Sequence, residues 1–457
     1  MCVIIVFMVS LPEEIVTFMD VFAKSNYQIY VVGGAVRDLL IGKTTLNWDF
    51  TTSAKPEEIL KLFPDGFYNN QFGTVGIPKK FNDQNVVFEV TTFRKESDYS
   101  DKRRPENVEW AKTIEEDLAR RDFTINAIAC DGKKLTDPFQ GQEHIKQKLV
   151  IAVGDPQVRF QEDALRLMRA VRLCTELGFV IDQKTHEAVK QNAHLITHVS
   201  WERIRDELFR IIMSDNAADG ILLLKETTLL KYILPEVDVC FEVQQVSPKR
   251  HHIYDVGTHL VMSLKHCPSK DVITRFATLL HDIGKAETYR KDEETKIITF
   301  YNHEVVGEKQ VGEIAKRFKL SNKDSHKLIT LVRSHQFTVS EIQTDKAVRR
   351  FIRQVGKEYL QDILDLRTGD RVGSGSTPTS WRLDLFKKRL EEVQKQPFSV
   401  TDLKIDGTDV MKTLDLKPGP EVGKILNALF DEVINGKVKN EKSSLLEVLP
   451  RLRDQNT

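Results

Sequence analysis

The amino-acid sequence predicts an α+β protein in which a small mixed-sheet head is followed by a mostly α-helical body. Three observations support this fold class. Strand and helix patterns alternate through the first third of the chain, helical periodicity dominates from residue 155 to residue 395, and a proline-bearing stretch, KQPFSVTD, precedes a final helical unit. At 457 residues the chain is too long for one hydrophobic core, so several domains are expected.

The head begins with a predicted helix over residues 11–25. The apolar strand YQIYVVGG then enters a glycine turn, and AVRDLLIG starts a helix that ends at Gly42. NWDFTT reads as a second strand, and SAKPEEILKLF as a helix opened by Ser53. TVGIPKKF and NVVFEVTTF have the pattern of a β-hairpin, so these elements together predict a small mixed sheet.

The rest of the chain has helical periodicity, with predicted breaks near Pro248, Pro268 and Gly369. Within it, SWERIRDELFRIIMSD is amphipathic, and its apolar stripe is expected to face a core. These changes of pattern divide the chain into four predicted domains. They are the head (1–154), a helical region (155–240), a second helical domain (241–395) and a C-terminal helical unit (396–457).

The composition limits the partner and the compartment. Lys plus Arg and Asp plus Glu number 67 each, so a nucleic acid would have to be held by a local basic face. The five cysteines are scattered without a CxxC pair, which indicates a reducing, cytoplasmic location and argues against a thiolate zinc site. The opening run MCVIIVFMV is too short to span a membrane and lacks a basic region, so no membrane anchor or export signal is predicted, and Met8 is an alternative start.

The head carries a pattern suited to nucleotide chemistry, GGAVRD…LNWDFTT, from Gly33 to Thr52. A glycine turn lets backbone N–H groups approach phosphates, and side chains two residues apart on a strand point to the same face. Asn47 and Asp49 stand at such positions, and Glu89 on FEVTTFR is the carboxylate expected to join them. Together these oxygen ligands suit Mg²⁺, although a structural, hydrogen-bonded role for Glu89 is an equal alternative.

A basic cluster follows in ARRDFTINAIA. Arg120 and Arg121 supply guanidinium groups that pair with phosphates, and Asp122 and Asn126 can hydrogen-bond a ribose hydroxyl. The alternative is a charge network at the start of a helix.

Five motifs appear in order along the chain: GGAVRD, NWD, DLARRDFTINAIA, LTDPFQGQ and EDALRLMRAVRLCTELGF. In these motifs the chain resembles class II tRNA nucleotidyltransferases, the family of bacterial CCA-adding enzymes and their poly(A) polymerase relatives. The resemblance covers nearly the whole chain. It implies a nucleotidyltransferase head that uses Mg²⁺, ATP and CTP, and a helical body that carries tRNA.

The resemblance also implies roles for single residues. The family's paired aspartates fall on Asn47 and Asp49. Its other motifs fall on Gly33, Gly34 and Arg37 in the phosphate-binding turn, on Arg120, Arg121 and Asp122 in the ribose-reading RRD, and on Glu162, Asp163 and Arg166 in EDxxR. In the family, this last aspartate and arginine bond the base edge of the incoming CTP or ATP. The spacing of Asp163 and Arg166 predicts that they share one helix face, with a surface ion pair as the alternative.

Asn47 departs from the family pattern. An amide removes one negative charge, weakens Mg²⁺ binding and cannot help a 3′-hydroxyl to lose its proton, so reduced transfer activity is expected. Asp38, Asp98 and Asp101 lie nearby in the sequence and are candidates to compensate.

A second set of metal-ligand residues follows the order H…HD…D. Its members are His259 in THLVMSL, His281 and Asp282 in LLHDIGK, and Asp370 in RTGDR. Such residues on separate helices can converge on a divalent ion, whereas a single buried histidine is usually structural. The order resembles that of HD-domain phosphohydrolases, and His303 and His335 are spaced as in HD domains with two metals. This resemblance implies hydrolysis of phosphate esters, with the metal unspecified.

The C-terminal segment KIDGTDVMKTLDLKPGPEVGKIL resembles the tRNA-contacting module of bacterial members of the family. Lys417, Gly419 and Lys424 can bring ammonium and backbone N–H groups to phosphates, which would position RNA without reading its sequence. Exposed surface lysines without a partner are an equal alternative.

The favoured function is template-independent addition of C and A to tRNA 3′ ends. A poly(A) polymerase, or an enzyme that adds only A or only CC, remains open. A second alternative is an HD-type phosphohydrolase of RNA ends or nucleotides, with a head weakened by Asn47. A noncatalytic tRNA-binding protein is disfavoured by the two metal-ligand sets, and no residue pattern specifies the oligomeric state.

Overall fold

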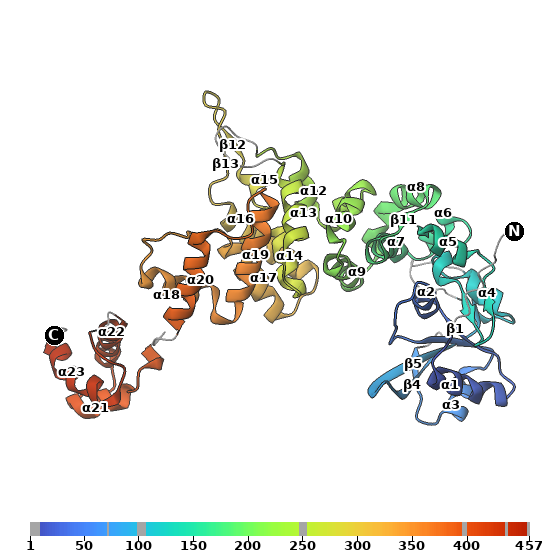
Figure 1. The fold of residues 1–457 in the computed structure, drawn as a ribbon, viewed down its shortest axis with the longest axis horizontal. Helices are drawn as coiled ribbons and strands as arrows, with labels where there is room; N and C mark the ends of the chain where they lie inside the picture. Colours follow the sequence, from blue (N-terminus) through green and yellow to red (C-terminus); the bar gives the residue numbers. More distant parts are fainter. Residues whose placement is uncertain are drawn as a thin grey trace.

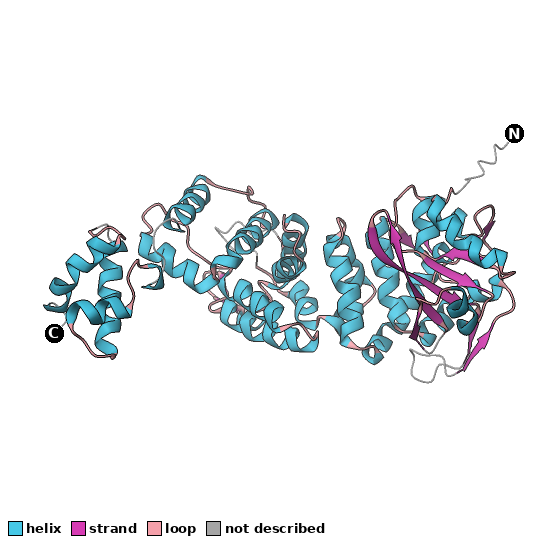
Figure 2. Ribbon diagram, turned by 90° about the horizontal axis from the view of Figure 1, so that it is seen from below, coloured by secondary structure: helices cyan, strands magenta, loops and turns pink. Residues whose placement is uncertain are grey.

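The computed structural model describes residues 10–70, 73–97, 107–245, 254–394, 400–434 and 437–454. The molecule is elongated, with the sheet-containing head at one end, the helical domains along the long axis, and the C-terminal helices at the other end (Figure 1 and Figure 2). The predicted α+β fold class is therefore confirmed. Four subjects of prediction lie outside the described residues, namely the opening apolar run, Asp98, Asp101 and Pro248.

A seven-stranded mixed sheet forms the head, in the order β3-β4-β5-β2-β1-β8-β9. Its strands are β1 (Ile29–Val32), β2 (Asp49–Thr52), β3 (Phe67–Asn70), β4 (Thr74–Phe81), β5 (Gln84–Thr92), β8 (Ala129–Cys130) and β9 (Leu135–Thr136). β2 is parallel to β5, and the other neighbours are antiparallel, including the predicted β4–β5 hairpin. The shorter strand pairs are β6 (Arg94–Ser97) with β7 (Asn107–Trp110), β10 (Leu149–Val150) with β11 (Val180–Ile181), and β12 (Arg290–Lys291) with β13 (Ile298–Thr299).

Helices cover this sheet and close the head. They are α1 (Glu13–Lys24), α2 (Gly34–Leu40), α3 (Pro56–Leu62), α4 (Ile114–Ala119), the 3-10 turn η1 (Thr124–Asn126) and α5 (Gly141–Gln147). The apolar stripe of α1 packs on the sheet through Phe18, whose ring lies 4.8 Å from that of Phe50. Ser53 does not open α3: the N-cap is Lys55, whose N–H donates to the Glu58 carboxylate at 2.7 Å.

The body is helical, as predicted. Its helices are α6 (Pro156–Glu162), α7 (Leu165–Leu177), α8 (Gln183–Asn192), η2 (Ala193–His198), α9 (Trp201–Met213), α10 (Ala217–Glu226), α11 (Leu229–Ile233), α12 (Pro235–Asp238), η3 (Val239–Glu242), α13 (Val256–His266), α14 (Val272–Leu280), α15 (Lys285–Thr288), α16 (His303–Arg317), α17 (Asn322–Ser334), α18 (Asp345–Val355), η4 (Lys357–Tyr359), α19 (Leu360–Gly373) and α20 (Trp381–Gln394). The amphipathic segment predicted to face a core is α9, and its residues Ile204, Leu208 and Ile211 are buried.

Gly369 does not break the helical pattern, contrary to the prediction. It lies within α19, where a Cβ atom would come within 2.6 Å of the Ser263 carbonyl oxygen on α13. Gly373, one turn later, faces Ser263 just as closely, with a Cβ position 2.6 Å from its backbone nitrogen. Both glycines therefore allow α13 and α19 to pack backbone against backbone.

The C-terminal helices have a core of their own. These helices are α21 (Gly407–Leu414), α22 (Pro420–Ile434) and α23 (Lys442–Asp454), after the 3-10 turn η5 (Val400–Asp402). Their buried residues, from Leu403 to Leu452, form a cluster separate from the large cluster that runs from the head to α20. The four domain boundaries stay predictions. Of the helices in the described residues, none combines the length and the apolarity needed to cross a bilayer.

Candidate functional site

Asp49 and Glu89 lie side by side in the head sheet. Asp49 is the first residue of β2, where it pairs with Val32 of β1 and, on the other side, with Glu89 of β5. Residues in register on neighbouring strands direct their side chains to the same face, so the two carboxylates stand on one face of the sheet. Glu89 is exposed and Asp49 is half-buried. Burial raises the pKa of Asp49, while the positive charges of Arg121 and Arg169 oppose that rise.

The prediction that Asn47 and Asp49 lie on the same strand is wrong, because β2 begins at Asp49. Asn47 lies before β2 and is exposed, and its backbone N–H donates a hydrogen bond to the Thr45 hydroxyl at 3.2 Å. The physical reason is that β1 ends at Val32 and the chain turns away at Gly33, so the sheet register begins at Asp49. Asn47 therefore belongs to the loop that leads into the site.

The glycine turn lies directly against these groups. Gly33 has a φ angle of +71°, and a Cβ atom there would lie 3.3 Å from Arg121 Nη1 and 3.7 Å from Asp49 Oδ2. Only glycine fits this conformation and this approach without strain. Gly34 starts α2. A phosphate group at this turn would meet the Arg121 guanidinium and any cation held by Asp49.

Arg37 serves the fold of this turn. Its guanidinium donates to Asp38 Oδ1 at 2.7 and 2.9 Å and to Asn126 Oδ1 at 2.7 Å. Asp38, a candidate to compensate for Asn47, is thereby paired with Arg37. Asn126 in turn donates to Asp122 Oδ1 at 3.2 Å, so the contacts link α2 to the RRD motif.

The basic cluster stands at the end of α4, not at the start of a helix. Arg120 is the C-cap of α4 and donates to the buried Asp117 at 2.8 and 3.0 Å, and Arg121 reaches the same carboxylate at 3.2 Å. Asp117 thus holds both guanidinium groups, because a buried carboxylate requires charged partners, and of the two Arg121 lies beside the glycine turn.

Asp122 is buried and paired with Arg169, a residue that the sequence reasoning missed. Arg169 Nε donates to Asp122 Oδ2 at 2.8 Å. Burial alone would raise the pKa of Asp122, but the Arg169 and Arg166 charges hold that pKa well below its usual range. Arg169 lies three residues after Arg166 on α7, and this helical spacing was the available signal.

Asp163 and Arg166 do not share a helix face. Asp163 ends α6 in an extended conformation, and Arg166 lies on α7. The Asp163 carboxylate caps Leu165 N–H at 3.0 Å and accepts from Arg203 of α9 at 3.0 Å. Asp163 lies outside both helices because an aspartate side chain caps a helix end more readily than it continues a helix.

The buried Arg166 guanidinium has different partners. It donates to Glu162 Oε2 at 2.6 Å, to the Arg159 carbonyl at 3.1 Å and to the Arg120 carbonyl at 3.0 Å. Arg166 therefore ties α6 and α7 to the end of α4. The i,i+3 ion pair that was the alternative for Asp163 and Arg166 is also absent from the ion pairs of the described residues.

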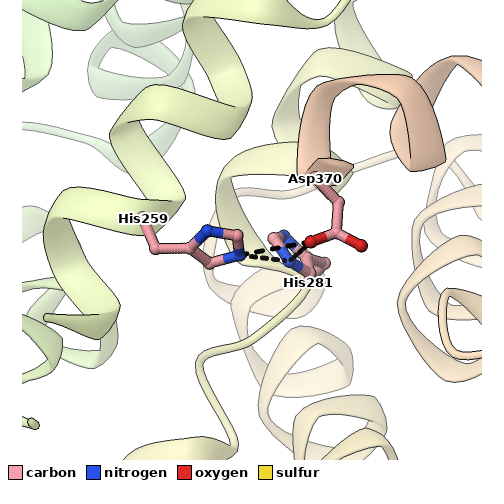
Figure 3. A group of neighbouring side chains, drawn as sticks. All are labelled: His259, His281 and Asp370. Atoms are coloured by element: carbon pink, nitrogen blue, oxygen red, sulfur yellow. Dashed lines mark hydrogen bonds and ion pairs between the residues drawn. The ribbon is translucent and has the colours of Figure 1, made fainter. Parts of the chain in front are cut away.

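The six predicted ligands of the helical region come together in one cluster, which we call the HD site and which is buried except for the half-buried Asp370. Its members are His259, His281, Asp282, His303, His335 and Asp370. Figure 3 shows the first half, where His259 of α13, His281 at the end of α14 and Asp370 of α19 point toward one another. His259 Nε2 lies 3.2 Å from His281 Nε2 and 3.4 Å from Asp370 Oδ1. The structure thus brings the six residues together, and their role as metal ligands stays a prediction.

Asp282 joins the two halves of the HD site. Its Oδ2 atom lies 3.3 Å from Nε2 of both His259 and His281. Its Oδ1 atom lies 3.1 Å from Nε2 of His303 and 3.4 Å from Nε2 of His335. One carboxylate therefore faces two groups of imidazoles, an arrangement that suits two neighbouring divalent ions.

Backbone carbonyls orient three of the four imidazoles. Nδ1 of His281, His303 and His335 each lies 2.7–2.8 Å from the carbonyl oxygen three residues earlier. Because a carbonyl only accepts, each Nδ1 must donate, and the Nε2 lone pair is left to face the cluster. This is the tautomer that a metal ligand requires.

Two cations border the cluster. Lys285 Nζ lies 2.6 Å from Asp282 Oδ2 and donates to Gln245 at 3.0 Å, and Arg367 lies 3.1 Å from Asp370 Oδ2. Burial alone would raise the pKa of Asp282, but Lys285 and the imidazoles hold it well below its usual range. The donor set, imidazole nitrogens and ionised carboxylates, fits divalent metals.

The predicted RNA-contacting residues of the C-terminal unit lie together. Lys417 and Gly419 precede α22, and Lys424 lies in its first turns. All three are exposed, and Pro420 starts the helix, as its fixed φ favours. RNA contact by these residues stays a prediction.

Comparisons with known proteins match this arrangement along the chain. Family models for the poly(A) polymerase head domain, for a probable RNA- and SrmB-binding site of polymerase A, and for a putative second domain of tRNA nucleotidyltransferase match residues 29–151, 178–241 and 289–449. A CCA-adding enzyme from Lactococcus lactis subsp. cremoris is 31% identical over 449 residues, which cover 97% of this chain and 98% of that protein. The chain belongs to the tRNA nucleotidyltransferase family of the CCA-adding enzymes.

Other members of this family show the same extent of similarity. An A-adding tRNA nucleotidyltransferase from Deinococcus radiodurans is 33% identical over 427 residues, covering 89% of this chain and 92% of that protein. The crystal structure of a Bacillus stearothermophilus CCA-adding enzyme in complex with CTP superposes with a TM-score of 0.73 at 28% identity, covering 97% and 99% of the two chains. The predicted family and the class of enzyme, a nucleotidyltransferase, are confirmed.

Proposed function

We propose that the protein adds C and A nucleotides to the 3′ end of tRNA from CTP and ATP, with Mg²⁺ and without a nucleic-acid template. The observation that carries this proposal is the in-register pair of Asp49 and Glu89 beside the Gly33 turn, in a chain related to CCA-adding enzymes. The cysteines of the described residues are free and buried, as suits the predicted reducing cytoplasm.

The carboxylates and the arginine around the Gly33 turn have separate proposed roles. Asp49 and Glu89 would hold Mg²⁺, and their oxygen donors suit that ion. When bound there, Mg²⁺ would supply positive charge against the triphosphate. Arg121 lies across the Gly33 turn, where it can bind phosphate oxygens. Asp117 fixes that guanidinium, so the phosphate-binding group is oriented before the substrate arrives.

A second group of residues would select the nucleotide. Arg169 orients the Asp122 carboxylate, which would bind the ribose, and Arg203 orients the Asp163 carboxylate, which would meet the base. In this proposal Asp163 accepts a hydrogen bond from the amino group that cytosine and adenine share. Arg166, which is buried and holds α6 against α4, stays a prediction as a base-binding residue.

Incorporation of labelled CTP and ATP into a tRNA that lacks CCA, with products separated by length, tests this function. Ordered addition of CCA supports it. Addition of A alone, of CC alone, or of a long A tail would instead select an A-adding enzyme, a CC-adding enzyme or a poly(A) polymerase. An A-adding enzyme is among the relatives, and the same site geometry would serve any of these activities, so this experiment is needed to decide between them.

Asn47→Asp is expected to raise incorporation at limiting Mg²⁺ by about tenfold, because it restores one negative charge in the loop before Asp49. The measurement is the initial rate of CTP incorporation as a function of Mg²⁺ concentration. Thr44→Asp adds the same charge at a neighbouring exposed position and is the matched control. Equal rates in Asn47→Asp and the unaltered protein would show that the missing carboxylate does not limit the reaction.

Asp163→Asn is expected to reduce the preference for CTP and ATP over UTP and GTP by at least about tenfold, because the amide offers the base a donor where the carboxylate offers only acceptors. Relative kcat/KM values for the four nucleotides measure this preference. Asp155→Asn is the control, since Asp155 caps the same helix, α6, at its other end and asparagine caps equally well. Unchanged discrimination would contradict a base-selecting role for Asp163.

We also propose a second function, metal-dependent hydrolysis of phosphate esters at RNA ends or in nucleotides by the HD site. The observation that favours it is the bridging position of Asp282 between two imidazole groups. Divalent ions held there would supply Lewis-acid chemistry. Lys285 and Arg367 leave the site less negative, which favours a phosphate ester. Release of p-nitrophenol from bis(p-nitrophenyl) phosphate with Mn²⁺, Ni²⁺, Zn²⁺ or Mg²⁺ tests this activity.

A further inference from the structure

The helix α18 presents a basic face to solvent. Its apolar face is fixed in the body through Phe351, whose ring lies 4.7 Å from that of Phe337 and 5.4 Å from that of Phe386. The opposite face carries Lys346, Arg350 and Arg353, all exposed. These positions follow the i, i+4, i+7 spacing of one helical stripe, which extends about 10 Å along the axis.

The three cations line a groove without any acidic residue. The other lining residues are Thr344 and Ala347. In the described part of the chain, Lys346, Arg350 and Arg353 take part in no ion pair, whereas the neighbouring Arg389 is paired with Asp345. The positive charge of this groove is therefore left for a partner.

A second surface groove on the body shows that this arrangement is not general. Beside α16, the exposed residues Lys309, Lys316 and Lys319 line a groove together with three glutamates. These are Glu287, Glu308 and Glu313. Opposite charges alternate there, as on an ordinary solvated surface. On α18, like charges one turn apart repel each other and disfavour the helix. A polyanion would remove that repulsion and would release its own counterions on binding.

The position of α18 indicates which polyanion. Together with α20, it lies along the long axis between the helices of the HD site and the C-terminal helices α21–α23, far from the head (Figure 1). An RNA whose 3′ end occupies the head and whose body extends along the molecule would pass this face. A nucleotide that reacts at Asp49 could not at the same time contact α18, which lies far from the head.

We propose that the face of α18 formed by Lys346, Arg350 and Arg353 binds the phosphate backbone of the tRNA substrate at a point remote from its 3′ end. This inference rests on the proposed tRNA nucleotidyltransferase function. The contact is to phosphates and not to bases. The charged side chains of the groove are all hydrogen-bond donors, whereas reading base edges calls for donors and acceptors together. It holds the body of the RNA while the head reacts with its end.

The test compares the triple variant Lys346→Glu, Arg350→Glu and Arg353→Glu with a matched triple variant on the other groove, Lys309→Glu, Lys316→Glu and Lys319→Glu. Binding of a fluorescent tRNA is measured without nucleotide over a series of salt concentrations, and KM is measured for tRNA and for a short hairpin with the same 3′ end. The α18 variant is expected to weaken tRNA binding at least about tenfold and to lower the salt slope by roughly 2–3. The hairpin KM and the control variant should stay within about twofold of the unaltered protein.

The inference is overturned by unchanged tRNA binding in the α18 variant, by an equal loss in the control variant, or by an equal loss for the hairpin. A variant with Arg350→Lys and Arg353→Lys keeps the charges and should bind tRNA normally; if it binds as weakly as the glutamate variant, a folding defect explains the loss and the inference also fails. The tRNA-binding arm needs no catalysis. If the unaltered protein binds tRNA but incorporates no nucleotide, the proposed transferase function fails while the α18 contact is still decided.

Discussion

Asp49→Asn is expected to lower nucleotide incorporation at least about a thousandfold, because it removes the charge of a carboxylate that lies against the Gly33 turn and pairs in register with Glu89. Through a bound Mg²⁺, Asp49 is expected to stabilise the transition state by several kcal/mol. The measurement is kcat/KM for CTP with a tRNA that lacks CCA. Asparagine keeps the shape of the side chain, so the sheet register with Val32 and Glu89 should survive.

The same variant separates catalysis from stability. Burial raises the pKa of Asp49, which means that the site disfavours its ionised form. A neutral amide should therefore leave the melting temperature unchanged or slightly higher while activity is lost. Asp83→Asn, in the exposed β4–β5 turn, is the control and should change neither quantity. Activity within tenfold of the unaltered protein would exclude Asp49 as a metal ligand.

Asp282→Asn is expected to abolish hydrolysis at the HD site, a loss of at least about a thousandfold. Its two oxygen atoms face different pairs of imidazoles, so one substitution removes the carboxylate that, among the described residues, both halves share. Metal analysis of protein loaded with Mn²⁺ should show that both ions are lost or strongly weakened. Addition of EDTA to the unaltered protein should give the same loss of hydrolysis, reversed by added metal.

Two comparisons make the result on Asp282 specific. Asp365→Asn alters an aspartate of α19 that lies outside the HD site and should leave hydrolysis unchanged. Incorporation of CTP by Asp282→Asn should stay within about twofold, since the head has its own carboxylates. Full retention of hydrolysis in Asp282→Asn would rule out a bridging role, and failure of the unaltered protein to hydrolyse any tested ester would contradict the second proposed function.

The elements that the sequence predicts well are those with strong local signals. The apolar strand before Gly33, the β4–β5 hairpin and α9 follow directly from hydrophobic periodicity and turn residues. The HD site could also be predicted, because histidine and aspartate on several helices have few reasons to recur in that order unless they meet. Glu89 could be predicted near Asp49 because both residues lie in strand patterns of the same predicted sheet.

The wrong predictions share one physical cause, because contacts between distant parts of the chain decided the structure at each of these positions. The two-residue spacing predicts Asn47 on β2, but the sheet register begins at Asp49, which pairs with the last residue of β1, Val32. Asp163 was expected on the helix of Arg166, but it caps the chain between two helices and pairs with Arg203, a residue 40 positions away. Gly369 was expected to end a helix, yet a glycine within a helix also serves where another backbone approaches. Spacing along the chain does not distinguish these cases.

The backbone contact between α13 and α19 has a consequence for the HD site. His259 lies one turn before Ser263 on α13, and Asp370 follows Gly369 on α19, so the separation of these two ligands is set by how closely the helices meet. A methyl group at Gly369 or Gly373 would force the backbones apart and carry His259 away from Asp370. Gly369 and Gly373 offer no ligand atom, yet they determine whether His259 and Asp370 lie close enough to act together. Substitutions at these two glycines should therefore damage the HD site as much as substitutions of its own six side chains.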